Sequence, residues 1–328
     1  MSTFGPSSAA ARVKEAARGL GFDLVGIARA RPLDPRPLDR WLAEGWDAGL
    51  PYMRQSREAR VDVSRVLPGA ESVVALAVGY RHPEPLPPSE PHGVVARYAR
   101  GRDYHNVVRR PLRRLCEAME RIVPGSVGYP SCDTRPVLEK VWAQEAGLGW
   151  IGKNGCVVTP AFGSYVLLAC VITTARLTPD APHPDRCGSC AACLGACPTG
   201  AFPAPRFVDA RLCLAFHTIE SHAPLPEAVA RRLSGRLFGC DLCQEACPWN
   251  RSEPPPPGVL GQALAPRAEQ TFVQLERLLR SSPEEIGSRI HGTPLARRGA
   301  EGLLLTARAL AEKDREDEPP SARPSPGG

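Results

Sequence analysis

Residues 187–198 read CGSCAACLGACP and hold four cysteines in the spacing C-x2-C-x2-C-x3-C, followed by a proline. A second run, CDLCQEACP at residues 240–248, repeats the last part of this pattern. Where this spacing occurs in pairs, three cysteines of a run hold one 4Fe-4S cube and the fourth ligates the other cube. The two runs therefore predict a segment that binds two 4Fe-4S clusters.

The second run holds three cysteines where the first holds four. Its missing member would fall at Leu237, so a cysteine from elsewhere must complete the ligands, and Cys213 lies between the two runs. Because the last cysteine of each run crosses to the other cube, the ligands divide into two sets. We assign Cys187, Cys190, Cys193 and Cys247 to the first cysteine set, and Cys197, Cys213, Cys240 and Cys243 to the second.

A zinc site and a set of disulfide bonds are the competing interpretations of these cysteines. Zinc takes four ligands, often from paired C-x2-C units, but it explains neither the third cysteine of the first run nor the proline after each run. Disulfide bonds need an oxidising compartment. The N-terminus shows no charged segment followed by an apolar core that would direct export. The sequence therefore favours clusters in a cytoplasmic protein.

The remaining composition is that of a soluble globular chain, with 43% hydrophobic residues among 328. The most apolar stretch, residues 165–174, is about half as long as a membrane span, so we expect a buried strand and no membrane association. The net charge of +6 permits phosphate binding without requiring it. Cysteines isolated in sequence usually act as small core residues, and we expect this of Cys116, Cys132, Cys156 and Cys170.

The first half of the chain alternates helical patterns with short apolar runs, which is typical of an α/β domain. Apolar residues at helical spacing predict helices over residues 7–20 and 38–48. Continuous apolar runs predict strands over residues 22–27, 73–78 and 165–174.

Three stretches of the same half combine polar residues with turn or cap signals. Residues 97–105, RYARGRDYH, precede a predicted helix and face either solvent or phosphate groups, which arginine binds well. Asp133 or Thr134 can cap a predicted helix that ends at Gly147. Residues 148–155, LGWIGKNG, hold three glycines, which allow either the close approach of a bulky ligand or ordinary tight turns.

Composition shifts divide the chain into four parts. The cluster segment carries a long insertion, residues 198–239, which could cover a second cofactor beside the clusters, and residues 272–279 and 294–311 are predicted to be helices. The predicted parts are an α/β domain (1–178), a two-cluster domain (179–252), a helical C-terminal segment (253–312) and a charged, proline-rich tail (313–328) that we expect to be disordered.

Together these stretches resemble the epoxyqueuosine reductases, cobalamin-dependent iron–sulfur enzymes of the last step of queuosine biosynthesis on tRNA. The resemblance spans roughly residues 10 to 311 and is more specific than the ferredoxin-type spacing alone. The residues that carry it, in the family's order, are 97–105, 133–134 with 136–139, 146–154, 218–220 and 239–250.

The resemblance implies a cobalamin-binding α/β domain, similar to that of reductive dehalogenases, with a ferredoxin-like two-cluster domain stacked against it and a short helical C-terminus. It implies that Asp133 is the proton donor and that tRNA carrying epoxyqueuosine is the partner. The positions that match cobalamin contacts are Arg60, Asp133, Lys153, Asn154, Val157, Val158, Thr159 and Leu168. We add Arg231, Arg232 and Arg236 as candidate tRNA contacts, and we expect a monomer that receives electrons from an unidentified donor.

The chain departs from the family pattern in three places. Some relatives have a cysteine where this chain has Ala96, so we expect no thiolate ligand to cobalt there. Histidine replaces the usual leucine at His217, which is either a metal ligand or, as we favour, an ordinary buried or surface residue. Many relatives continue into HEAT-like repeats, of which residues 292–311 alone match here, so any part of those repeats in tRNA binding is in question.

The chemistry of the implied reaction fits these cofactors. Converting an epoxide to an alkene with loss of water needs two electrons and two protons, and amino-acid side chains cannot supply the electrons. Two alternatives stay open from the sequence: a dehalogenase-like cobalamin enzyme for a small molecule, and a two-cluster electron-transfer protein without catalytic activity. Cobalamin in the purified protein would exclude the second.

Overall fold

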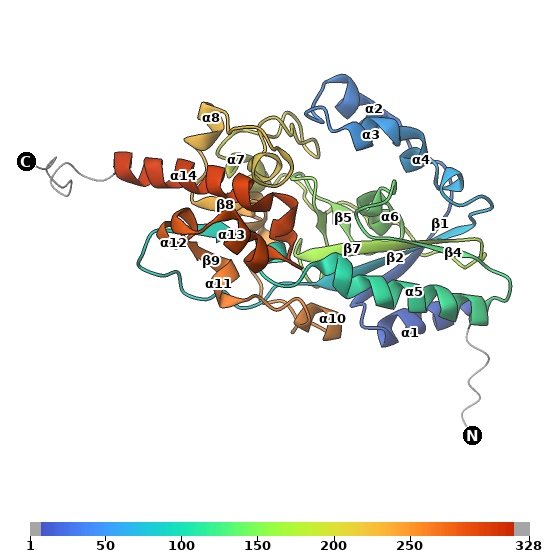
Figure 1. The fold of residues 1–328 in the computed structure, drawn as a ribbon. Coiled ribbons are helices and arrows are strands. Elements are labelled where there is room, and N and C mark those ends of the chain that lie inside the picture. The colour runs from blue at the N-terminus through green and yellow to red at the C-terminus, as the bar shows by residue number, and fades with distance from the viewer. Residues whose placement is uncertain (1–7, 318–328) are drawn as a thin grey trace, which may run out of the picture.

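A four-stranded antiparallel sheet forms the centre of the N-terminal half in the computed structural model, which describes residues 8–317 (Figure 1). The strand order is β1-β2-β7-β4, and each neighbouring pair is antiparallel. The strands are β1 (Leu24–Arg29), β2 (Ser72–Gly79), β7 (Val166–Thr173) and β4 (Gly128–Ser131).

Strand β2 is buried along its whole length because both faces of the sheet are covered. Alternate side chains of a strand point to opposite faces, so β2 contributes to two cores. Val74, Leu76 and Val78 belong to the first core, and Val73, Ala75 and Ala77 belong to the second. This arrangement explains the continuous apolar run in the sequence.

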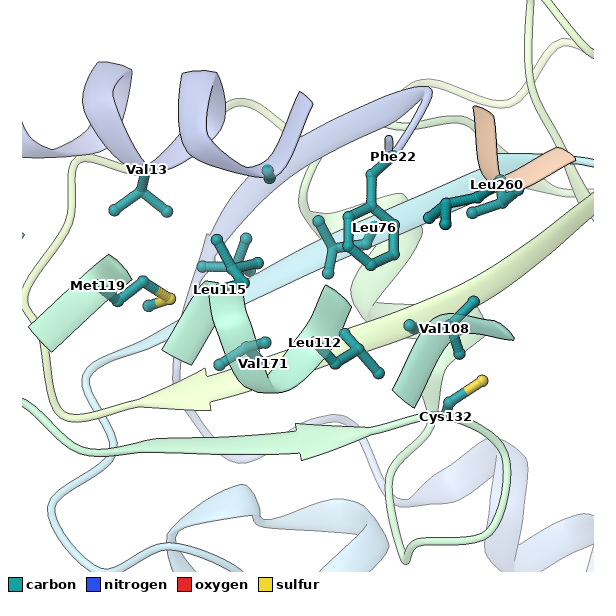
Figure 2. Packing of buried hydrophobic residues seen from close by; sticks show 14 of the residues in the cluster. Val13, Phe22, Leu76, Val108, Leu112, Leu115, Met119, Cys132, Val171 and Leu260 are labelled. Carbon is teal, nitrogen blue, oxygen red and sulfur yellow. The ribbon is translucent and has the colours of Figure 1, made fainter. Parts of the chain in front are cut away.

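Helices cover the two faces of the sheet. On the first face, α1 (Ala9–Gly19) and α5 (Tyr104–Ile122) pack side by side; Figure 2 shows Val13 of α1, Leu115 of α5 and Leu76 of β2 in the core that they share. On the second face, α6 (Glu139–Glu145) packs with Trp142 fully buried. The α/β class predicted from the sequence is confirmed.

The segment between β1 and β2 forms three short helices set apart from the sheet in Figure 1, above α6. These helices are α2 (Arg36–Ala43), α3 (Pro51–Gln55) and α4 (Arg57–Val61). Arg60 of α4 is buried although α2 and α3 bury no residue fully. The segment therefore carries one inward-facing cation next to the sheet domain.

A third core joins segments that are far apart in the chain. Strand β3 (His92–Val95) pairs in parallel with β8 (Arg236–Phe238) and antiparallel with β9 (Phe272–Gln274). Helices α12, α13 and α14 pack on this small sheet, so the insertion and the C-terminal segment share one core with residues 95–99. The bounds are α12 (Leu275–Arg280), α13 (Pro283–Ile290) and α14 (Gly299–Asp317).

The other elements are short. The cysteine runs form α7 (Ala192–Gly195) and α9 (Leu242–Glu245), and the glycine-rich stretch forms a hairpin of β5 (Trp150–Ile151) and β6 (Val157–Val158). The rest are a π-helix (Phe216–Glu220), α8 (Glu227–Ala230), α10 (Val259–Gln262), α11 (Ala268–Thr271) and 3-10 turns at Val63–Arg65, Arg97–Ala99, Pro248–Asn250 and Pro294–Arg297.

Several predicted helices were wrong in part, and the one expected over 38–48 ends at Ala43. The helix expected over 133–147 begins at Glu139 with no side-chain cap, so neither Asp133 nor Thr134 caps it. Residues 272–274 pair with β3 and form strand β9, so the helix begins only at Leu275.

The C-terminal boundaries also differ from the prediction. Residues 294–311 divide into a 3-10 turn and helix α14, which continues to Asp317, past the expected start of the tail at Lys313. Residues 318–328 of the predicted tail lie outside the described residues. Between residues 8 and 317, no helix is both long enough and apolar enough to span a membrane.

Candidate cluster and proton-donor site

The thiols of the first cysteine set lie close together. Burial raises the pKa of Cys193, and the neighbouring thiols of Cys247, Cys187 and Cys190 raise that pKa further. Burial likewise raises the pKa of Cys247, and the nearby Cys187 and Cys190 raise the pKa of Cys247 further. Three residues of the first run and the last residue of the second run therefore share one location, which is the grouping we expect for the first cluster.

The second cysteine set is gathered in the same way around Cys213. Burial raises the pKa of Cys213, whose thiol lies near Cys197. Burial also raises the pKa values of Cys240 and Cys243, with Cys213 as a charged neighbour of both thiols. Cys213 belongs to the insertion, and the spacing pattern of the two runs alone could not have specified that its thiol lies near Cys240 and Cys243.

A site for a single metal ion would bring several ligand side chains to one point. Among residues 8–317, no three histidine, cysteine or carboxylate side chains converge in this way. In a 4Fe-4S cube each thiolate binds a different iron, so its four ligands need not meet at one point. The choice between zinc and two cubes therefore rests on the cysteine spacing, which predicts two cubes.

Cys156 is the one isolated cysteine that the sequence misplaced. Cys132 and Cys170 are buried in the cores as expected. Cys156 instead lies beside the second set. Burial raises the pKa of Cys156, and the nearby Cys213 raises it further. Burial also raises the pKa of Cys243, with Cys156 as a further cause. No spacing signal distinguishes it, because it is remote from both runs in the sequence.

The glycine-rich hairpin touches both cysteine sets. Trp150 Nε1 donates a hydrogen bond to Cys187 Sγ at 3.3 Å, and Lys153 Nζ donates to the carbonyl of Gly188 at 2.8 Å. Asn154 Nδ2 lies 3.5 Å from the carbonyl oxygen of Cys243. A Cβ at Gly149 would come within 2.1 Å of a backbone oxygen of the facing strand, so at least this glycine is required by the hairpin itself.

A buried polar network fixes the cysteine segment against the loop before β7. Asn250 Oδ1 accepts a hydrogen bond from the backbone of Ser164 at 2.8 Å, and Asn250 Nδ2 donates to Ser164 Oγ at 2.8 Å. Gln244 accepts from Ser164 Oγ and donates to Asp241. Gly163, with φ +57°, allows the close approach, because a Cβ there would lie 1.9 Å from Asn250 Oδ1.

Asp133 lies in the loop after β4, in a left-handed backbone conformation with φ +60°. Such a conformation is uncommon for residues other than glycine and often marks functional sites. The side chain is 69% exposed, and its Oδ2 accepts a hydrogen bond from Tyr104 Oη at 3.1 Å. His105 Nε2 lies 3.5 Å from the same oxygen. Glu139 Oε1 accepts from the backbone nitrogen of Asp133 at 3.1 Å and holds the loop in place.

The pKa values of Asp133 and His105 decide which of the two carries a proton. The hydrogen bond from the close His105 imidazole holds the pKa of Asp133 below the usual range. Burial lowers the pKa of His105, but its hydrogen bond to Asp103 and the nearby Asp133 carboxylate outweigh burial and raise that pKa to about 9. At neutral pH the pair therefore holds its proton on His105.

Further charged and aromatic groups surround the Asp133 loop. Arg60 Nε donates to Ser56 Oγ at 2.9 Å, and its guanidinium lies 5.9 Å from the ring centre of Tyr52. Arg297 forms a 2.6 Å ion pair with Glu220. Burial raises the pKa of Tyr52, with Glu220, Arg297, Asp133 and Arg60 as its charged neighbours. The C-terminal segment thus brings Arg297 to this site, a contribution that the sequence did not predict.

The other predicted cofactor contacts differ in accessibility. Val157, Val158 and Thr159 are buried, whereas Leu168 is partly buried. Ile151 and Val166 are partly buried at the same core. Lys153 and Asn154 contact the cysteine segment, as described above.

The positions that raised questions in the sequence are both buried. Ala96 packs toward Gly239. His217 Nε2 lies 2.7 Å from the carbonyl oxygen of Arg211, and its buried Nδ1 has no hydrogen-bond partner among the described residues. Arg231 is exposed and pairs with Glu227.

The two remaining candidate tRNA contacts differ from each other. Arg232 is exposed and bonds to a helix carbonyl. Arg236 is 11% exposed and pairs with Glu245 at 2.8 Å. Arg236 is therefore the least accessible of the three arginines that we considered as tRNA contacts.

Comparisons with known families support this organisation. A family model described as a 4Fe-4S double cluster binding domain matches residues 186–250, and a family model of epoxyqueuosine reductase QueG matches residues 60–134. The epoxyqueuosine reductase of Gloeobacter violaceus is 44% identical over 307 residues, covering 92% of this chain and 95% of the relative. That of Pseudomonas aeruginosa is 38% identical, covering 91% of this chain and 84% of the relative.

Solved structures give the same result. An epoxyqueuosine reductase crystallised with an epoxyqueuosine-modified tRNA-Tyr stem loop superposes with a TM-score of 0.84 at 31% identity, covering 93% of this chain and 81% of that chain. The Bacillus subtilis enzyme, with its catalytic aspartate loop swung out of the active site, superposes with a TM-score of 0.84 at 30% identity and the same coverage.

Replacing Cys213 tests the assignment of the second cysteine set. Cys213→Ala should lower the iron content of anaerobically reconstituted protein from about eight to about four atoms per chain, because one of two four-iron clusters loses a ligand. Cys116→Ala, which removes a thiol remote from both sets, is the control and should keep full iron content. Full iron and unchanged cluster spectra in Cys213→Ala would show that another residue completes the set.

Proposed function

We propose that this chain, which belongs to the epoxyqueuosine reductase family, reduces epoxyqueuosine to queuosine in the anticodon of tRNA. One observation carries the proposal: a double-cluster segment is fixed against the same domain that presents an exposed Asp133 beside the partly buried His105. Electron carriers and a proton donor thus occur in one chain, as reductive removal of an epoxide oxygen requires.

The cofactors of the proposed reaction are two 4Fe-4S clusters and cobalamin. The two cysteine sets would hold the clusters, and the partly buried side chains of Ile151, Val166 and Leu168 would offer apolar contacts to a corrin ring. Bound cobalamin would supply the two-electron reduction that no side chain can perform. The proposed cobalamin contacts remain Arg60, Asp133, Lys153, Asn154, Val157, Val158, Thr159 and Leu168.

The role of Asp133 and His105 is to deliver a proton to the departing oxygen. His105 is protonated at neutral pH and lies 3.5 Å from the Asp133 carboxylate. We propose that the proton passes from His105 through Asp133 to the oxygen. Tyr104 would orient both groups, because it donates to Asp133 and its ring stacks on His105 with centroids 4.0 Å apart.

The macromolecular partner in this proposal is tRNA carrying epoxyqueuosine. A relative of 31% identity was crystallised with such a stem loop, which supports the assignment. Exposed Arg231 and Arg232 are the proposed contacts on the insertion, and Arg236 is a weaker one because it is mostly buried. We further propose a cytoplasmic monomer whose clusters are reduced by a separate electron donor.

The direct test is turnover on modified tRNA. Protein reconstituted anaerobically with iron, sulfide and cobalamin, and reduced chemically, should convert epoxyqueuosine in tRNA to queuosine, detected by mass analysis of the nucleosides. Protein reconstituted without cobalamin is the control. Full cluster content with bound cobalamin and no conversion would reject the proposed substrate.

Asp133→Asn separates a proton donor from a loop residue. Asparagine also tolerates a positive φ, so the loop should keep its conformation, but an amide cannot deliver the proton. Turnover should fall by a factor on the order of a hundred to ten thousand, the usual contribution of a general acid. The measurement compares variant and parent at matched iron and cobalamin content. Turnover close to that of the parent would remove Asp133 from the mechanism.

The pH profile tests the part played by His105. Because the pKa of His105 is raised to about 9, the imidazole keeps its proton through neutral pH and loses it as pH rises through about 9. Turnover should therefore fall over that range, and this alkaline limb should be absent in His105→Gln, whose overall rate is lower. The same limb in both proteins would assign it to another group.

A further inference from the structure

A cavity of about 390 Å³ opens between helix α5 and the Asp133 loop. It lies directly beside the proposed proton donor: Cys132 and Thr134, which flank Asp133 in the chain, both line it, and so does His105. Its volume is within the range of sites that hold a small molecule. His105 and the Asp133 loop are the only parts of its lining that belong to the sequence motifs or the proposed cofactor contacts described above.

The rim of the cavity is strongly cationic. Arg109 and Arg113 of α5 and Arg135 of the loop line it and are exposed. Within the described residues, no carboxylate lies within 4.0 Å of any of these three guanidinium groups, whereas Arg297 near the site is paired with Glu220. Arg135 lies 5.5 Å from the ring centre of Tyr129, which limits its freedom. Three uncompensated guanidinium groups at one opening favour an anionic ligand.

The floor of the cavity is apolar. Val108 and Leu112 of α5, Pro130 of β4 and Cys132 line it. Figure 2 shows Val108 and Leu112 on the helix close to Cys132 at the end of the strand. An apolar floor under a cationic rim matches a ligand with a flat, weakly polar part and a phosphate group.

We propose that this cavity binds the nucleotide next to the modified one, with its base on the apolar floor and the RNA backbone phosphates on Arg109, Arg113 and Arg135. The proposal rests on the proposed function, because it takes the RNA from that assignment. Single-stranded loops are recognised through unstacked bases and backbone phosphates. Enzymes that act on one base of a strand also take selectivity from contacts to flanking nucleotides.

The position of the cavity explains why such a contact would matter. The same loop that carries Asp133 forms one wall through Cys132, Thr134 and Arg135, so a phosphate bound to Arg135 would be tied to the loop that holds the proton donor. Helix α5 forms the other wall, and His105 is on that helix. Binding of the flanking nucleotide would thus place both members of the proton-donating pair relative to the RNA strand.

The test uses a matched pair of double variants in the full-length holoenzyme. Arg109→Gln with Arg113→Gln removes two charges from the rim. Arg110→Gln with Arg114→Gln removes two charges from exposed positions one residue further along the same helix that do not line the cavity. Iron content and Tm are first matched between both variants and the parent. The three proteins are then compared for their binding of an epoxyqueuosine-modified stem loop. Their kcat/KM values are measured on the stem loop and on the free nucleoside.

The rim variant should weaken stem-loop binding by about tenfold or more and lower the salt dependence of log Kd by roughly 0.7 for each phosphate that the variant no longer binds. Its kcat/KM should fall further on the stem loop than on the nucleoside. The control variant should change the Kd for the stem loop less than twofold. It should also change the ratio of kcat/KM on the stem loop to kcat/KM on the nucleoside less than twofold. Equal losses in the two variants would indicate general attraction between RNA and α5 and overturn the proposal. Equal losses on stem loop and nucleoside in the rim variant would also overturn it.

Failure of the proposed function would give a different result. A parent enzyme that turns over neither substrate contradicts epoxyqueuosine reduction, while the stem-loop binding comparison still decides on the cavity. Competition by uridine 5′-monophosphate separates the sources of the phosphate. If the mononucleotide displaces the stem loop from the parent but not from the rim variant, the cavity binds nucleotides. If the mononucleotide binds both proteins equally, the assignment of the cavity is wrong.

Discussion

The amide side chain of Asn250 holds the cysteine segment in register with the sheet domain. It bonds both the backbone and the hydroxyl of Ser164 in a buried setting, where an unpaired polar group would be costly. Gln244 and Asp241 extend the same network, and the backbone of Arg97 donates to Asp241. Since Gln244 and Asp241 sit within the second cysteine run, the network ties the cluster ligands directly to the loop before β7.

The consequence is that two kinds of surroundings coexist in a small volume. The cysteine segment is held by buried hydrogen bonds that leave little room for adjustment. The Asp133 loop is exposed, has a strained backbone at one residue and is held by the side chains of Glu139 and Tyr104. Electron carriers profit from fixed positions, whereas a proton donor must meet a bulky RNA substrate, so this division matches the two tasks.

Much of this arrangement follows from the sequence. The continuous apolar run of β2 indicated a strand covered on both faces, and the cysteine spacing indicated two clusters, because both signals depend on local periodicity. The start of α6 was not predictable, because the residue that decides it, Glu139, accepts from Ser131 and from the backbone of Asp133 and so belongs to the loop as much as to the helix. The place of Arg297 was equally hidden, since its ion pair with Glu220 depends on tertiary packing. The low pKa of Asp133 depends on His105, a neighbour in space that no spacing rule places there.

The pairing of β3 has a consequence for the growing chain. This strand ends at Val95, but its partners β8 and β9 begin at Arg236 and Phe272. At about 5–20 residues per second, synthesis needs roughly ten to thirty-five seconds to add the last of them. During that time the sheet domain can fold around β2 while β3 leaves the ribosome as an unpaired edge. His92 and the short length of the strand limit its pairing with other chains, and the small sheet closes only after β9 has been made, as far as Gln274.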